Sequence, residues 1–337
     1  MKMKSFGYRA ALFAVLACSQ GMAAAAAIGP ATRALPSDWY PESLAAGPDG
    51  SLYIGSWRQG AVARLRPQAE QPEILVTPGS NGLANGQGVL VDAKRKLLWV
   101  CSGTIGFTTV PMTPSALKSY DLASGAPRGS YPMPDKGYCN DLAQDSHGNL
   151  YVTDSLNPRV LRLAPDDKAL HIWKQDPAFN AGKEGYNLNG IAIDRDQHVY
   201  VSLVTAAAQL LRIDVQANGD AAAVTQIDMP RMLKNADAIR MGEPDRQGRA
   251  RLVIFESNAF GHDGPYGGQI SVASLDGNRA ATLQTIVSGL NDPSSGVIVG
   301  RRVYYIESKY SLLFKSKDDA HIPRGVPFDV QSAELPE

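Results

Sequence analysis

The amino-acid sequence predicts an all-β fold, a six-bladed β-propeller with four-stranded antiparallel blades around a central metal-binding channel. Short runs rich in aromatic and β-branched residues recur six times, at intervals of 46 to 55 residues, and each follows a turn containing Asp or Gly. About 310 residues after the first segment divide into six units of about 52. Repetition of four-stranded units at this period is typical of propellers, whereas a β-sandwich does not repeat its sequence in this way.

Each recurring run is predicted to be the second strand of its blade, here named the signature strand. The six signature strands are expected at 51–56, 97–102, 150–155, 198–202, 252–257 and 303–308. Each ends in a serine, and because six serines occupy one strand position, we expect them to be structural rather than nucleophilic.

Further strands are expected on both sides of the signature strands. The next strand of each blade is predicted at 60–66, 116–121, 159–163, 209–213, 269–273 and, in the sixth blade, 312–315. A third strand often follows, as at 73–76. The strand before each signature strand, as at 190–194, is expected to lie innermost. No segment has the length and 3.6-residue pattern of a crossover helix, so one domain is predicted.

The first 27 residues are predicted to be an export signal. Three basic residues precede a short apolar run at 10–18, and the alanine tract at 23–27 provides small residues for cleavage. The apolar run is too short to span a bilayer. We therefore expect residues 1–27 to be removed and residues 28–337 to form one exported propeller domain, periplasmic or secreted, with no transmembrane span.

Two further expectations follow from this end of the chain. The segment Val15-Leu16-Ala17-Cys18 loosely resembles a lipid-attachment box, so lipoprotein anchoring through Cys18 is an alternative to free export. Removal of the signal changes the net charge from 0 to −3, with 30 basic and 33 acidic side chains left. A balanced or slightly acidic chain argues against a nucleic-acid partner.

One position of the innermost strands carries the candidate chemistry. It is found eleven residues before the aromatic residue of each signature strand, with allowance for a longer turn in blade five and a shorter one in blade six. The six residues are Glu42, Gly88, Asn140, Asn189, Asp237 and Ser294. Four convergent oxygen donors predict a divalent cation, most naturally Ca²⁺, with Mg²⁺, Mn²⁺ and Zn²⁺ as alternatives. The structural alternative is that Asn and Asp cap turns at strand entry.

The motifs at this position resemble those of the regucalcin/gluconolactonase (senescence-marker-protein-like) family. They read Pro41-Glu42-Ser43-Leu44, Cys139-Asn140-Asp141-Leu142, Leu188-Asn189-Gly190-Ile191 and Ala236-Asp237-Ala238-Ile239. The resemblance covers the chain after the signal and implies a six-bladed propeller with a channel metal, in a family of which many members hydrolyse sugar lactones. It implies that Glu42, Asn189 and Asp237 bind the metal, that Asn140 is a ligand or a substrate contact, and that Asp237 is the general base.

The chain departs from the family pattern in two places. It has Ala236-Asp237-Ala238 where the family usually has Pro-Asp-Gly. It also has Tyr138-Cys139 just before Asn140, where lactonases of the family carry an arginine that binds sugar acids. The second departure argues against an acidic sugar lactone more than against the metal.

The expected function is that of an exported metal-dependent hydrolase, which opens a lactone or related small ester through a metal-polarised carbonyl and an activated water. One alternative is a non-enzymatic propeller that binds a ligand or partner and uses the metal structurally. Another is an aryl-ester or phosphotriester hydrolase on the same site. A small-molecule substrate and a monomer are expected.

Long loops after two signature strands are expected to shape the substrate pocket. They contain Phe107 in blade two and His262 and Tyr266 in blade five; Asp141 and Ser294 complete the candidate substrate-binding residues. His262 is either a second base or a solvated loop residue. Finally, Cys101 and Cys139 are expected at the same face of neighbouring blades, where they form a disulfide or remain two buried thiols.

Overall fold

The computed structural model describes residues 32–182, 186–203, 209–259 and 263–337. The predicted signal peptide at 1–27, with Cys18, and the candidate residue His262 lie outside the described residues. No helix within the described ranges is long and apolar enough to cross a membrane.

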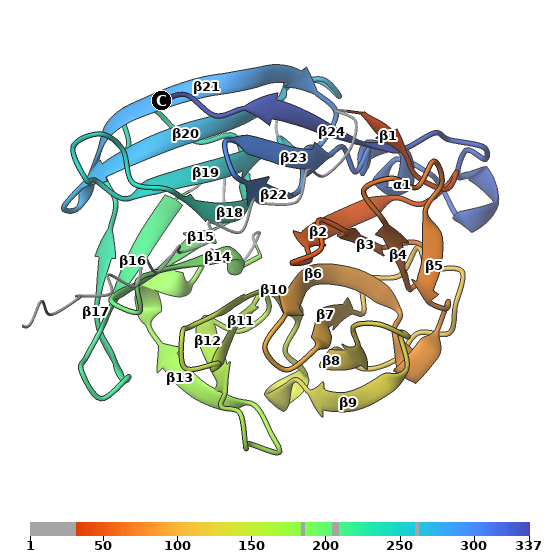
Figure 1. Ribbon diagram of the computed structural model, residues 1–337, viewed down its shortest axis with the longest axis horizontal. Coiled ribbons are helices and arrows are strands. Elements are labelled where there is room, and N and C mark those ends of the chain that lie inside the picture. Colours follow the sequence, from red (N-terminus) through yellow and green to blue (C-terminus); the bar gives the residue numbers. More distant parts are fainter. Residues whose placement is uncertain (1–31, 183–185, 204–208, 260–262) are drawn as a thin grey trace, which may run out of the picture.

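Six four-stranded antiparallel sheets are arranged around a central axis, which confirms the predicted propeller (Figure 1). From the innermost strand outward, blade one contains β2 (Pro41–Ala46), β3 (Leu52–Ser56), β4 (Ala61–Leu65) and β5 (Glu73–Val76). Blade two contains β6 (Asn85–Asp92), β7 (Leu97–Gly103), β8 (Ala116–Asp121) and β9 (Pro127–Pro132). Blade three contains β10 (Cys139–Gln144), β11 (Leu150–Asp154), β12 (Arg159–Leu163) and β13 (His171–Gln175).

The second half of the ring repeats this order until the last blade. Blade four contains β14 (Leu188–Asp194), β15 (His198–Leu203), β16 (Gln209–Val215) and β17 (Ala221–Gln226). Blade five contains β18 (Ala236–Gly242), β19 (Arg251–Glu256), β20 (Gly268–Asp276) and β21 (Arg279–Leu290). Blade six contains β22 (Gly296–Val299), β23 (Arg302–Ile306), β24 (Asp329–Glu334) and β1 (Arg33–Ala34).

Blade six therefore closes the ring with strands from both ends of the described chain. The outermost strand β1 pairs with β24, with Arg33 opposite Val330. The strand expected at 312–315 is wrong, because α1 (Ser311–Phe314) lies there instead. A helical turn buries Leu313 in the core and brings Phe314 into contact with Trp57. An extended strand would have separated these two apolar contacts.

Both faces of each sheet are buried against the neighbouring blades, which explains the nearly continuous apolar signature strands. Ile54 of β3 packs in one cluster with Ile306 of blade six. The preceding residue, Tyr53, points to the opposite face and packs in another cluster with Val100 of blade two. Since successive strand residues face opposite sides, a blade that is covered on both sides needs apolar residues at both phases.

The structure decides between the two alternatives for the cysteines and bears out the structural role of serines in the signature strands. Cys101 of β7 and Cys139 of β10 form a disulfide between blades two and three, with Cα atoms 5.1 Å apart. The repeated serines are structural. Ser155 Oγ donates to the Leu188 carbonyl at 2.7 Å, and Ser202 Oγ donates to the Asp237 carbonyl at 2.8 Å. These two bonds tie the signature strands of blades three and four to the innermost strand of the next blade.

Candidate functional site

A β-bulge recurs near the start of the innermost strand in five blades. The pairing with the signature strand shifts by one residue between Pro41 and Leu44 in β2, and at the equivalent positions of β6, β10, β14 and β18. A bulge re-aims side chains and is common beside functional sites. The first bulged residues, which all line one cavity, are Glu42, Gln87, Asn140, Asn189 and Asp237. We call these five residues the ring.

The ring corrects the expectation for blade two, where Gln87 rather than Gly88 occupies the position. The turn between β6 and β7 is one residue longer than the turn between β2 and β3, because Val91 pairs with Leu98 where Ala46 pairs with Leu52. Gly88 has a different role. A Cβ atom there would lie 2.7 Å from Asp141 Cα and 2.8 Å from the Asn140 carbonyl oxygen. Glycine therefore permits β6 and β10 to approach each other closely.

The cavity has a volume of about 310 Å³ and combines the polar ring with a largely aromatic wall. The wall residues come from segments just after signature strands, just before innermost strands, and from α1 and the residue before it. They are Trp57, Ile105, Tyr138, Tyr186, Ala259, Tyr310 and Phe314. The four oxygen-bearing residues predicted from the sequence thus lie together at one cavity, as expected.

Without a bound cation, the ionised form of Glu42 is strongly disfavoured. Its side chain is buried, and Oε2 has no hydrogen-bond partner. Burial raises its pKa well above the usual range, and repulsion by Asp237 and Asp141 raises it further, while Arg240 opposes the shift. A cation beside this carboxylate would relieve both the desolvation and the repulsion.

Asp237 is the second carboxylate of the ring. Burial raises its pKa to about 7, although hydrogen bonds from Ser257 and Asn189 act in the opposite direction. The nearby carboxylates of Asp141 and Asp292 add to the increase. Two buried carboxylates that repel each other are an arrangement in which a bound divalent cation is favourable.

The donor set fits a hard cation. Asn140 Nδ2 donates to Ser155 Oγ at 2.9 Å, which leaves Asn140 Oδ1 buried without a partner. Over the described ranges, no group of three or more His, Cys, Asp or Glu side chains is placed to hold a metal. The ring instead offers two carboxylates with amide oxygens, the oxygen ligands that Ca²⁺ and Mg²⁺ accept.

Asp141 lies beneath the ring and does not line the cavity, contrary to the expectation that it binds substrate. Its Oδ2 accepts from Arg240 Nη1 at 2.7 Å. Arg240 also donates to the Ser295 hydroxyl at 3.0 Å and the Gly296 carbonyl at 3.1 Å. Blades three and five are not neighbours, so this ion pair crosses the central channel and its carboxylate is already occupied.

The other candidate substrate residues that the structure describes, Ser294, Phe107 and Tyr266, also lie outside the cavity lining. Ser294 is fully buried, and its hydroxyl donates to the Glu42 carbonyl at 2.7 Å, so it supports the ring from behind. Phe107 packs edge-on against Phe314, with ring centroids 5.6 Å apart, and supports the wall rather than forming it. Tyr266 is 66% exposed. Loop membership alone did not distinguish these residues from true lining residues.

The aromatic wall was not predicted from the sequence, although the positions of these residues next to strand ends indicate it. Trp57 directly follows a signature strand, and Tyr138 directly precedes an innermost strand. Tyr186 lies two residues before an innermost strand, and Tyr310 lies four residues after a signature strand. Because the strands are antiparallel, these ends meet at one mouth of the channel, so aromatic residues there could have been assigned to the cavity.

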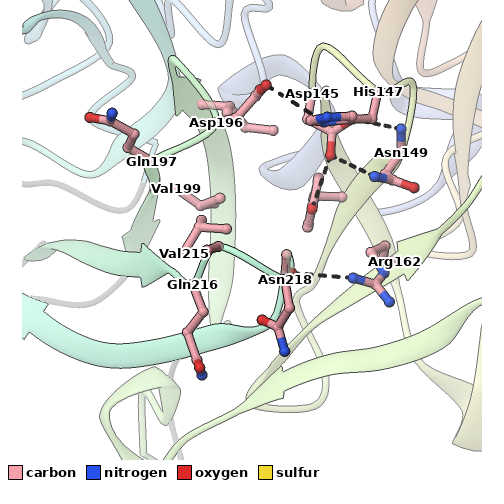
Figure 2. Close-up of a pocket in the computed structure, with 14 residues that line it drawn as sticks. Asp145, His147, Asn149, Arg162, Asp196, Gln197, Val199, Val215, Gln216 and Asn218 are labelled. Carbon is pink, nitrogen blue, oxygen red and sulfur yellow. Dashed lines mark hydrogen bonds and ion pairs between the residues drawn. The ribbon is translucent and has the colours of Figure 1, made fainter.

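A larger pocket of about 480 Å³ lies between the turns of blades three and four, at the other end of the innermost strands (Figure 2). Its carboxylates are already engaged. Asp145 accepts from Asn149 Nδ2 at 2.7 Å and from the Tyr151 hydroxyl at 3.2 Å, and Asp196 accepts from the Ser146 backbone at 3.0 Å. Because these groups satisfy one another, the ring cavity is the better candidate site.

No protein-family model matches this chain, and no curated protein matches its sequence. Solved structures do match. The Malassezia sympodialis allergen Mala s 1 has a TM-score of 0.62 at 14% identity, over 90% of this chain and 96% of its own. A luciferin-regenerating enzyme has a TM-score of 0.58 at 14% identity, over 90% and 95%. A Xanthomonas campestris gluconolactonase has a TM-score of 0.55 at 16% identity, over 90% and 87%. The chain shares the propeller fold of these proteins, as the resemblance of its motifs predicted.

Proposed function

We propose that this protein is an exported, divalent-cation-dependent hydrolase that opens a lactone or a related small ester. One observation carries the proposal: Glu42, Asn140, Asn189 and Asp237 converge on a buried cavity, where Glu42 and Asn140 each keep an oxygen atom without a partner. The similarity to a solved gluconolactonase supports the same reaction class.

The ring residues would hold the cation, most naturally Ca²⁺, through two carboxylates and the two asparagine oxygens. When bound, the cation supplies Lewis-acid polarisation of the ester carbonyl and stabilisation of the oxyanion. The cavity lies within the channel mouth, so its walls limit access of bulk water to the reacting ester.

Asp237 is the proposed general base, and it would act through the carboxylate oxygen that the cation does not occupy. It takes a proton from the water whose oxygen attacks the carbonyl carbon. The ester C–O bond then breaks, and the departing alkoxide receives that proton back from Asp237, so that water is added across the bond and a hydroxy acid results. Hydrogen bonds with Ser257 and Asn189 orient the Asp237 carboxylate during this transfer.

Two observations support the exported location. The chain contains a buried disulfide, and stable disulfides belong mainly to oxidising compartments. The predicted signal at 1–27 agrees with this location.

The test is a substrate panel assayed with and without chelator. Full-length protein is expressed, and the purified product is assayed by acid release on glucono-δ-lactone, γ-phenyl-γ-butyrolactone, p-nitrophenyl acetate and a phosphotriester. We expect chelation to abolish hydrolysis, calcium to restore it, and Asp237→Asn to lower kcat by about a hundredfold or more. The matched control is Asp166→Asn, in an exposed turn. Equal activity with chelator, without it and in Asp237→Asn would overturn the proposal.

A further inference from the structure

We propose that the ring cavity selects an uncharged lactone with an aromatic or alkyl substituent, and that Trp57, Gln87 and Tyr138 recognise its oxygen atoms. For the reaction, the inference rests on the proposed lactone-opening function. Recognition of the substrate oxygens by the three residues concerns binding alone.

The charges of the cavity exclude an anionic substrate. Among the lining residues that the structure describes, Glu42 and Asp237 are the charged ones, and none is Lys, Arg or His. The guanidinium of Arg240 lies nearby but is bound by Asp141 and Ser295. A divalent cation would balance the two ring carboxylates. A carboxylate or phosphate on the substrate would then be buried without a counter-charge, which is costly.

The wall favours an apolar substituent. Trp57 contacts Tyr310 and Phe314 edge-on, with ring centroids 4.9 Å and 5.5 Å apart, so the three rings form one continuous aromatic surface. Ile105 extends the apolar lining. Such surfaces gain most from covering an aromatic or alkyl group. The volume of about 310 Å³ lies at the small end of ligand pockets, which suits a compact substituted lactone rather than an oligosaccharide.

Three polar groups in the same cavity lack partners. Trp57 Nε1, Gln87 Nε2 and the Tyr138 hydroxyl make no hydrogen bond, although the residues are only 5%, 2% and 2% exposed. A buried donor left unpaired is unfavourable, and an acceptor oxygen of a ligand would satisfy it. Each of the three can donate, whereas Asn140 Oδ1 and the oxygen of an ionised Glu42 accept.

The three unpartnered donors and the proposed base come from different blades. Trp57, Gln87 and Tyr138 belong to, or directly adjoin, strands of blades one to three, whereas Asn189 and Asp237 belong to blades four and five. The substrate oxygens would therefore face blades one to three, with the proposed base on the other side. This arrangement recognises an ester by its acceptor atoms and requires no charge on the substrate.

The first experiment compares three lactones on the purified wild-type protein with calcium. They are γ-phenyl-γ-butyrolactone, the anionic 5-oxotetrahydrofuran-2-carboxylate and the polyhydroxylated glucono-δ-lactone. We expect kcat/KM for the phenyl lactone to be at least tenfold above both others. A preference for the anionic or polyhydroxylated lactone would overturn the inference while leaving metal-dependent hydrolysis intact.

The second experiment measures binding without turnover. Calorimetry with 5-phenylpyrrolidin-2-one, a lactam that resists hydrolysis, is performed on wild type and on Trp57→Phe, Gln87→Met and Tyr138→Phe. Each loss of a donor should weaken lactam binding about fivefold. The matched control, Tyr131→Phe on the outer strand β9, should bind like wild type. Unchanged thermal midpoints would show that the variants are folded.

The two experiments separate the two proposals. Lactam binding that depends on the three donors, in a protein without hydrolytic activity, would support the recognition site and overturn the proposed function. Lactam binding that is absent, or equal in all variants, would overturn the recognition site, whatever the hydrolysis assay shows.

Discussion

The carboxylate of Asp141 lies 2.7 Å from the guanidinium of Arg240 and joins blades three and five through the central channel. Asp141 is almost completely buried, so the pair is shielded from solvent. Because Asp141 follows Asn140 in β10 and Arg240 lies in β18 with Asp237, the pair joins the two strands that carry these ring residues.

Removal of one member of this pair should destabilise the fold. Asp141→Asn and Arg240→Met each leave a poorly compensated buried group, and we expect each to lower the free energy of unfolding by about 3 kcal/mol. Urea unfolding measures the effect. The double variant Asp141→Asn/Arg240→Met should lose less than the two single losses combined, because no unpaired charge remains. Additive losses would argue against direct coupling.

The disulfide should contribute strongly to stability. Cys101 and Cys139 are separated by 38 residues, and the chain-entropy relation gives about 4 kcal/mol for closing a loop of that length. Reduction with dithiothreitol should therefore lower the urea midpoint. The variant Cys101→Ala/Cys139→Ala should unfold at the midpoint of the reduced wild type and should not respond to dithiothreitol. A wild-type midpoint unaffected by reduction would contradict the prediction.

Glu256, at the end of β19, makes the free energy of unfolding depend on pH. Burial alone would raise its pKa, but hydrogen bonds from Arg231, Gln269 and Ser271 outweigh burial and hold the pKa below the usual range. The two bonds from Arg231 are each 2.8 Å long. A lowered pKa in the folded state means that this contribution is present above the unfolded-state pKa of about 4.3 and is lost as the pH falls below it.

The test of this dependence is Glu256→Gln. We expect it to lower the free energy of unfolding at pH 7 by about 2 kcal/mol, because charge-assisted hydrogen bonds are lost. The difference from wild type should shrink as the pH falls below about 4, since Glu256 of the unfolded chain then takes up a proton that the folded chain must release. Urea unfolding at pH 7, 5 and 3.5 measures this trend. A difference that is constant with pH would be inconsistent with an ionised Glu256.

Calcium should stabilise the folded protein through the ring. A ligand that binds only the folded state adds about 2.7 kcal/mol at one hundred times its Kd, so calcium should raise the thermal midpoint of chelator-treated wild type. Glu42→Gln and Asp237→Asn should reduce the shift, whereas the control Asp166→Asn should retain it. The same shift in all four proteins would place the calcium site elsewhere.

Gly88 should not tolerate a side chain. Its Cβ would lie within 2.8 Å of two backbone atoms of blade three, and Gly88→Ala should therefore cost about 2 kcal/mol through overpacking. Gly242→Ala is the matched control in the innermost strand β18, because the nearest atom to its Cβ would be 3.7 Å away. Comparable unfolding midpoints for the two variants would show that β6 and β10 are less closely packed than described.

The repeat in the sequence determined the fold class, the signature strands and four of the five ring residues, whereas it left open whether Cys101 and Cys139 are bonded. These follow from local pattern, since strand alternation and turn spacing recur in each blade and place Glu42, Asn140, Asn189 and Asp237 in one phase. The pattern misplaced Gly88 for Gln87, because one additional residue in a single turn shifts the register. It also predicted a strand at 312–315, where four residues cannot distinguish a strand from a helical turn.

Tertiary structure alone decided how the ends close the ring, which side chains form the cavity wall and which carboxylates remain available. The pairing of β1 with β24 joins residues about 300 positions apart, and Arg240 reaches Asp141 across blades that are not neighbours. Such contacts depend on the curvature and closure of all six blades, which no local pattern contains. The ring of oxygen ligands was therefore readable in the sequence, whereas its aromatic wall and the ion pair beneath it were not.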